Sequence, residues 1–161
     1  MSRIQESVIV RTIVRIMVPF IELFALYVIM HGSGGPGGGF QGGVIFGAAI
    51  ILYAMIYGIT KGKERMPVTL DKILASTGLT IYAGTGLLCL FFGGKFLQYG
   101  VVPLLPDDPA EVSALLIDAV EIGIGITVLA VMISLFFDVS PPESEEEELP
   151  AELPISTYRE A

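Results

Sequence analysis

The stretch that decides the fold is His31-Gly-Ser-Gly-Gly-Pro-Gly-Gly-Gly-Phe-Gln-Gly-Gly43, which separates two long apolar runs, 16–30 and 44–59. Eight of its thirteen residues are glycine. An ordinary flexible linker would carry more serine and charge than this stretch does. Glycine at this density instead lets backbone approach backbone closely and adopt positive φ angles. We therefore expect a tight, packed crossing between two helices at a membrane edge.

A nucleotide site is the alternative interpretation of this stretch. The pattern G-x-G-x-x-G occurs twice, once from Gly32 and once from Gly37. A dinucleotide site requires a preceding strand and a βαβ unit, whereas the flanking runs here are apolar and predict helices. No Gly-Lys-Ser/Thr ending follows the glycines. We therefore expect neither a nucleotide cofactor nor a nucleic-acid partner.

The composition predicts an integral membrane protein. The chain has 161 residues, of which 53% are apolar and 16% charged. A transmembrane helix needs ~20 mostly apolar residues, and four segments meet that length: 8–30, 40–59, 73–92 and 114–137. These runs are continuous rather than alternating, which favours helices over barrel strands. We expect an all-α membrane domain of four transmembrane helices over residues 1–138.

Basic residues set the expected orientation, since acidic residues contribute little to it. Lys95 is the basic residue between the third and fourth spans. The remaining basic residues before Asp138 precede or enter the first span or surround the link between the second and third: Arg3, Arg11, Arg15, Lys61, Lys63, Arg65 and Lys72. The positive-inside rule therefore predicts that both termini are cytoplasmic and that the glycine-rich stretch faces outward.

The two ends of the fourth span carry separate signals. Asp108-Pro109-Ala110-Glu111 combines an N-cap, a proline at the first helical position and an acid in the first turn, so it predicts a helix start. After the span, seven of the 17 acidic residues lie beyond Asp138. The tail 139–161 has the composition of a disordered segment. We expect it to dock on a cytoplasmic or peripheral partner subunit.

Three acids lie within predicted spans, namely Glu22, Asp118 and Glu121. Ionisable groups inside a membrane face protein or water and are candidates for ion or proton paths. Counted from the outer span ends at the helical rise, Glu22 lies ~12 Å deep and Glu121 ~10 Å, so we expect similar depths. Asp118 lies one turn nearer the outside, on roughly the same face as Glu121. The alternative is a structural acid, neutralised by a proton or by a neighbouring Lys or Arg.

Other chemistry-bearing residues are few. His31 stands at the outer membrane edge, where it could be a hydrogen-bonding anchor or a proton shuttle. Cys89, the single cysteine, lies inside the third span and is expected to be a small buried hydrophobe. The sequence contains no Cys/His metal cluster, nucleophile–base pair or phosphate site. We therefore expect no catalytic site, no metal and no cofactor.

At the family level, the run 15–43 resembles the B-type subunits of the multisubunit sodium/proton (Mrp/Mnh-type) antiporters. The core from Pro36 to Gly43, after a span that ends in His-Gly, is the specific part, and Leu115-Leu-Ile-Asp-Ala-Val-Glu-Ile-Gly-Ile-Gly125 is similar to a later family segment. The resemblance implies a multi-pass subunit of the cell membrane, assembled with other membrane subunits. It also implies a structural loop made of His31, Gly32, Pro36, Gly37, Gly38, Gly39, Phe40, Gly42 and Gly43.

Homologous subunits also occur in archaeal membrane-bound hydrogenases and sulfur-reducing complexes, where electron transfer is coupled to ion pumping. From this resemblance we interpret the chain as a non-catalytic subunit of a module that couples Na⁺ and H⁺ movement, within a hydrogenase-type respiratory complex. The alternatives are the B-type subunit of a stand-alone antiporter, a purely structural assembly subunit, and a small independent channel.

Overall fold

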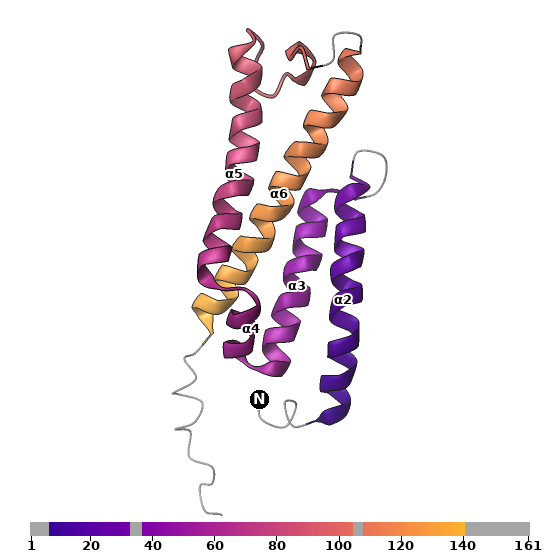
Figure 1. Ribbon diagram of the computed structural model, residues 1–161, viewed down its shortest axis with the longest axis vertical. Coiled ribbons are helices and arrows are strands. Elements are labelled where there is room, and N and C mark those ends of the chain that lie inside the picture. Colours follow the sequence, from indigo (N-terminus) through magenta and orange to yellow (C-terminus); the bar gives the residue numbers. More distant parts are fainter. Residues whose placement is uncertain (1–6, 33–36, 105–107, 141–161) are drawn as a thin grey trace, which may run out of the picture.

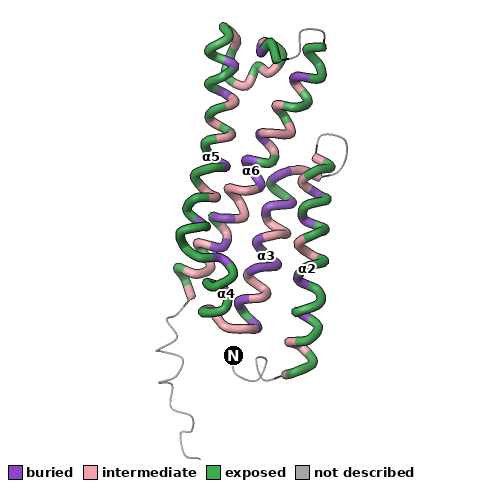
Figure 2. The backbone as a smooth tube through the Cα atoms, viewed as in Figure 1, coloured by how far each residue is buried: buried purple, intermediate pink, exposed green. Residues whose placement is uncertain are grey.

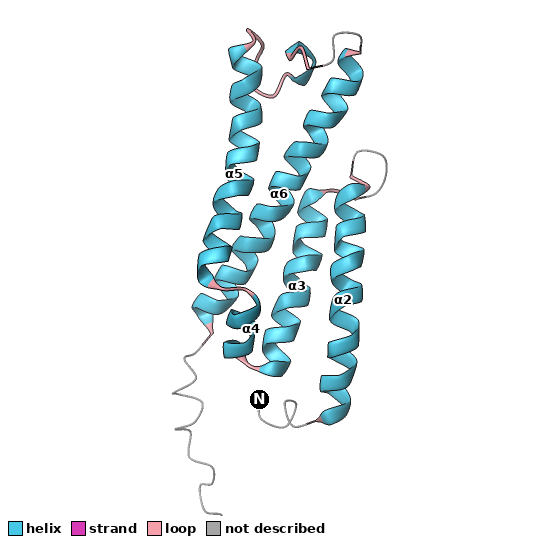
Figure 3. Ribbon diagram, viewed as in Figure 1, coloured by secondary structure: helices cyan, strands magenta, loops and turns pink. Residues whose placement is uncertain are grey.

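The computed structural model describes residues 7–32, 37–104 and 108–140. Pro36 and most of the acidic tail, which were both singled out from the sequence, lie outside these residues. The described elements, in chain order, are α2 (Val8–Met30), α3 (Gly39–Tyr57), α4 (Ile59–Arg65), α5 (Val68–Phe91), the 3₁₀ turn η1 (Tyr99–Val101) and α6 (Pro109–Val139). Within this part of the chain every regular element is helical (Figure 3).

The long helices form two antiparallel hairpins, α2–α3 and α5–α6, which lie side by side in one layer (Figure 1). Across the layer the order is α5, α6, α3, α2, and each helix packs on its neighbour. The contact between α3 and α6 joins the two hairpins. The short helix α4 follows α3 and packs back against it. The layer therefore has α2 and α5 at its edges.

Four of the described helices, α2, α3, α5 and α6, are long and apolar enough to cross a membrane. The expected all-α membrane fold with four spans is confirmed. The first predicted span matches α2 from end to end. The third helix begins at Val68, five residues before its predicted apolar segment. The fourth begins at Pro109, where the Asp108-Pro109 signal predicts a helix start and five residues before its apolar segment. Hydropathy underestimates their length because their first turns carry polar residues.

Local sequence explains where the last span begins and ends. Asp108 caps α6, since its Oδ1 accepts hydrogen bonds from the backbone N–H groups of Ala110 (2.9 Å) and Glu111 (3.3 Å). Pro109 occupies the first helical position, where its missing donor costs nothing. The helix ends at Val139, just before the Pro141-Pro142 pair of the sequence. The predicted start signal is confirmed.

The two hairpins are staggered. The end of α5 and the start of α6, which are joined through the turn η1, extend beyond the end of α2 and the start of α3 (Figure 1). This extension has its own small core of Cys89, Val102 and Val112, packed by Tyr99. Cys89 is fully buried, as expected for a small hydrophobe. The stagger sets which part of α6 lies beside the glycine-rich stretch.

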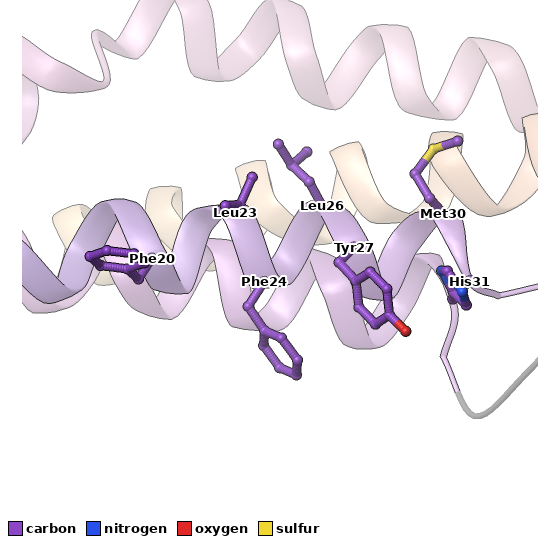
Figure 4. Close-up of a pocket in the computed structure, with 7 residues that line it drawn as sticks. All are labelled: Phe20, Leu23, Phe24, Leu26, Tyr27, Met30 and His31. Atoms are coloured by element: carbon purple, nitrogen blue, oxygen red, sulfur yellow. The ribbon is translucent and has the colours of Figure 1, made fainter.

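Burial differs strongly between the edges and the centre of the layer (Figure 2). Buried residues gather along α3, including Gly39, Gly42, Gly43 and Gly47. By contrast, α2 presents many large apolar side chains to its surroundings. One shallow groove on α2 is lined by residues that share this outward face: Phe20, Leu23, Phe24, Leu26, Tyr27, Met30 and His31 (Figure 4). This is the surface expected of a helix that faces lipid or another subunit.

Candidate ion-path site at the glycine segment

The start of α3 lies directly against the backbone of α6. A Cβ atom built on Gly39 would overlap the backbone carbonyl of Glu121. One turn further, a Cβ on Gly43 would lie 3.0 Å from the Cα of Gly125, and one on Gly125 would lie 2.9 Å from the carbonyl oxygen of Gly39. Small residues permit this backbone-to-backbone approach between membrane helices. The glycines of α3 are therefore the surface on which α6 packs.

The same segment also fits closely against α2. A Cβ on Gly42 would lie 2.8 Å from the carbonyl oxygen of Ala25, and one on Gly37 would lie 2.6 Å from that of Val28. The backbone N–H of Gly38 donates to the Val28 carbonyl at 3.2 Å. Gly38 has φ 148°, a value that side chains disfavour. The tight, packed crossing expected from the sequence is thus present in the described part of the stretch.

Glu121 lies where α6 passes this crossing. Its side chain is half-buried, and Oε2 is enclosed with no hydrogen-bond partner among the described residues. A Cβ on Gly32 would overlap Oε2, and it would also come within 3.0 Å of the Cα of Gly38. The absence of side chains on the glycines therefore makes the space that the Glu121 carboxyl fills. An enclosed carboxyl oxygen without a donor carries a large free-energy cost unless a proton or a cation neutralises the group.

Glu22 has a different environment. The guanidinium of Arg65, at the end of α4, donates to both carboxylate oxygens of Glu22, at 2.8 and 3.0 Å. The Arg65 guanidinium carbon also lies 4.9 Å from the ring centroid of Tyr53 on α3. Arg65 therefore crosses the face of α3 and joins the link between α3 and α5 to α2. Both hydrogen bonds come from one guanidinium nitrogen, Nη2, and this charge-assisted contact satisfies the charge of Glu22 within the chain.

The expectation that Glu22 and Glu121 share one depth is wrong. Glu121 contacts Gly32, which follows the end of α2, whereas Glu22 lies eight residues before that end, or about 12 Å along the helix. The error arises because α6 starts at Pro109 and projects beyond the first hairpin. A depth obtained by counting residues from the ends of apolar segments takes no account of this stagger between the hairpins.

The structure also places the other site candidates. Asp118 is half-buried on α6, three residues before Glu121. His31 follows α2, is exposed, and stacks on the ring of Tyr27 with centroids 4.2 Å apart (Figure 4). Phe40 is 62% exposed at the first turn of α3. These three side chains therefore surround the crossing, whereas Gly32, Gly37, Gly38, Gly39, Gly42 and Gly43 form it.

Sequence reasoning missed Arg65 as a partner of Glu22. Arg65 was counted only as one of several basic residues that fix the orientation of the chain. No spacing rule connects it to Glu22, since the two residues are 43 positions apart. The usable signal was the general rule that an acid inside a membrane helix requires a partner.

The fold and the site together define a class of protein: a multi-pass helical membrane subunit whose helices pack through glycine contacts. Within that class, a family model described as "Domain related to MnhB subunit of Na+/H+ antiporter" matches residues 9–134. The chain belongs to this MnhB-related family and is a multi-pass protein of the cell membrane.

Curated relatives agree with this assignment. A protein of Staphylococcus haemolyticus (strain JCSC1435) named "Putative antiporter subunit mnhB2" is 33% identical over 144 residues, which cover 87% of this chain and 99% of the relative. A protein of Staphylococcus aureus (strain Newman) with the same name is 31% identical over 137 residues, covering 84% of this chain and 96% of the relative. The similarity therefore extends over nearly the whole length of both relatives.

Proposed function

We propose that this chain is a non-catalytic subunit of an antiporter-like module that couples Na⁺ and H⁺ movement, and that it contributes Glu121 to the ion path. The observation that carries the proposal is the enclosed Oε2 of Glu121, which has no hydrogen-bond partner among the described residues. Such an oxygen is a place where a proton or a cation can bind and leave. Asp118, one turn away on α6, would extend the acidic surface toward the outside.

The packing around Glu121 supports this role. The carboxyl lies against Gly32, which follows α2, while the backbone of Glu121 lies against Gly39 at the start of α3. A rigid surround keeps a binding group in one position. Because the described helices form a single layer, the other side of the path would come from a neighbouring membrane subunit.

The decisive test replaces the carboxyl and keeps its shape. Glu121→Gln retains the size of the side chain but cannot ionise. We expect the complex to assemble and ion-coupled transport in membrane vesicles to fall by about 10²-fold or more, the usual effect of removing a positioned proton-transfer group. Transport would be followed with a pH-sensitive dye after addition of Na⁺.

Glu22→Gln is the matched control, because Arg65 already satisfies that carboxylate. We expect this variant to lose far less transport than Glu121→Gln at equal assembly. Wild-type transport in an assembled Glu121→Gln complex would disprove the ion-path role and leave the purely structural role as the explanation.

The orientation of the chain is part of the proposal. Basic residues of the described chain lie mainly near the start of α2 and on α4, which favours cytoplasmic termini. Ser2→Cys should be labelled by an impermeant thiol reagent only from the cytoplasmic side, and Asp107→Cys only from the outside. Labelling of Ser2→Cys from the outside would reverse the topology and place Glu121 at the cytoplasmic face.

The proposal also concerns the type of complex to which this subunit belongs. The names of the relatives favour a stand-alone multisubunit antiporter, whereas the sequence resemblance also includes hydrogenase-type respiratory complexes. Affinity purification of the native complex with mass spectrometry distinguishes the two host complexes, since a hydrogenase-type complex would include metal-containing redox subunits.

The same purification with residues 141–161 deleted tests our proposal that the acidic tail binds a cytoplasmic subunit. We expect that subunit to be lost from the complex.

A further inference from the structure

A second enclosed acid lies at the opposite end of the molecule from the glycine crossing. Asp71, in the first turn of α5, is 5% exposed and is the buried charged residue of the described chain. Its Oδ1 is fully enclosed and has no hydrogen-bond partner among the described residues. The sequence around Asp71 carries no signal of this site, because an acid in the first turn of a helix usually serves only to complement the helix dipole.

Two polar side chains of α6 act on the Asp71 carboxyl. The Ser134 hydroxyl lies beside the Asp71 carboxyl, and Asp138 lies close enough for its negative charge to repel that of Asp71. Ser134 and Asp138 are one helical turn apart, so they lie on one face of α6. Asp138 is exposed, near the end of the helix. A short line of polar groups therefore leads from solvent at the end of α6 to the enclosed carboxyl.

Among the described residues, the cations at this end of the molecule do not neutralise Asp71. Arg65 pairs with Glu22, and Lys63 lies over the ring of Phe137, with its nitrogen 5.9 Å from the centroid. The side chains of Lys61, Glu64 and Lys72 are exposed. The charged group that acts on Asp71 is therefore another acid, Asp138.

We propose that Asp71 is a proton-binding carboxyl that exchanges its proton, through Asp138, with the water at this end of the molecule. In the loading step the Asp138 carboxylate accepts a proton from a hydronium ion, which becomes water, and passes it to the Asp71 carboxylate. Asp138 returns to its ionised form and Asp71 becomes a neutral acid. The Ser134 hydroxyl would hold the acid in place. This site is separate from Glu121, and the inference does not depend on the ion path proposed there.

A proton fits the site better than a sodium ion does. Hard cations bind to several oxygen ligands at once. Here one carboxyl, one hydroxyl and one exposed acid are available, and the described residues contain no group of three or more His, Cys, Asp or Glu that could hold a metal ion. A proton needs only one oxygen of Asp71, and it removes the cost of enclosing a charge.

Infrared difference spectroscopy on the purified, assembled complex tests the proposal directly. The wild type minus Asp71→Asn spectrum should contain the C=O stretch of a protonated carboxylic acid at neutral pH. Exchange into D₂O should shift this band, and Asp138→Asn should slow the shift at least about tenfold, a small share of the ~10²–10⁴-fold that a positioned proton-transfer group contributes. Glu64→Gln, an exposed acid on α4, is the matched control and should leave the band and its exchange rate unchanged.

Each outcome decides the point. A spectrum without the carboxylic acid band between pH 5 and pH 8 would overturn the proposal, and an unchanged exchange rate in Asp138→Asn would overturn the route. If Asp71→Asn does not assemble, Ser134→Ala serves instead: loss of its hydrogen bond should move the C=O band of wild-type Asp71, and a band that stays in place would overturn the assignment. Transport by Glu121→Gln is measured separately, so failure of one proposal leaves the other testable.

Discussion

Glu22 and Glu121 are both acids on membrane-spanning helices, but they differ in what faces them. Glu22 receives two hydrogen bonds from Arg65, at 2.8 and 3.0 Å. Glu121 faces glycine, and its enclosed Oε2 has no partner among the described residues. One carboxyl has its charge satisfied by a described residue of the same chain, whereas the other has no such partner among the described residues.

The difference shows how a membrane subunit can use the same residue type for two purposes. A charge that is matched within the chain fixes the position of two elements, here the link α4 and the helix α2. A charge that is unmatched but held rigidly is free to bind a mobile ion. The partner decides between the two roles, and the partner lies far away in the sequence.

We expect the largest effect, a loss of complex assembly, when a side chain is introduced into the glycine crossing beside Glu121. Gly39→Val should abolish assembly, because even a Cβ at this position overlaps the Glu121 carbonyl, which is backbone and cannot move aside. Gly38→Val should also impair assembly through its φ of 148° rather than through crowding. Native gel electrophoresis of solubilised membranes measures the yield of complex.

Gly84→Ala is the control for these variants, since a Cβ there meets no atom within 4 Å. It should assemble normally. Normal yield and normal transport in Gly39→Val would show that the crossing is not rigid and would remove the physical basis for an enclosed Glu121.

A smaller effect should follow from breaking the ion pair of Glu22. Arg65→Gln leaves the carboxylate without its partner, and we expect the complex to lose thermal stability. The double variant Glu22→Gln/Arg65→Gln should recover part of the loss, with an interaction free energy of ~0.5–3 kcal/mol. Thermal unfolding in detergent gives the four values of the cycle. If the stability changes of the two single variants simply add in the double variant, the ion pair contributes nothing to stability. Glu22 would then no longer differ from Glu121 in having its charge stabilised within the chain.

The smallest effect is expected at His31. Its ring stacks on Tyr27 on the exposed face of α2, 4.2 Å between centroids. His31→Asn should change transport less than about twofold, in line with the ±0.5 kcal/mol typical of surface substitutions. A loss as large as that of Glu121→Gln would instead support the proton-shuttle role and extend the ion path along the outside of α2.

The helices were predictable because their signals are local. Long apolar runs identify the spans, and the Asp108-Pro109 start was confirmed by two backbone hydrogen bonds. The glycine-rich stretch was correctly expected to make a tight crossing. Its contact with Glu121, however, depends on how far α6 extends past α3. That register is set by packing between distant segments, to which hydropathy is insensitive.

The candidate site was predictable only in part. Glu121 and the glycines could be singled out one by one, because an acid in a membrane and a dense glycine run are both rare. Their adjacency could not be predicted, and neither could the pairing of Glu22 with Arg65. Asp71 carries no sequence signal of enclosure, and its neighbours Ser134 and Asp138 lie on a helix some 60 residues later. Tertiary contacts of this kind require the structure.

The single-layer arrangement of the four long helices has a consequence for the living membrane. The described helices enclose no lumen, because α2 and α5 lie at opposite edges and do not close on one another. A copy that is synthesised and inserted before its neighbours arrive therefore offers no route across the bilayer within these helices. Under the function proposed above, the ion path would be completed only when a neighbouring subunit packs against this layer.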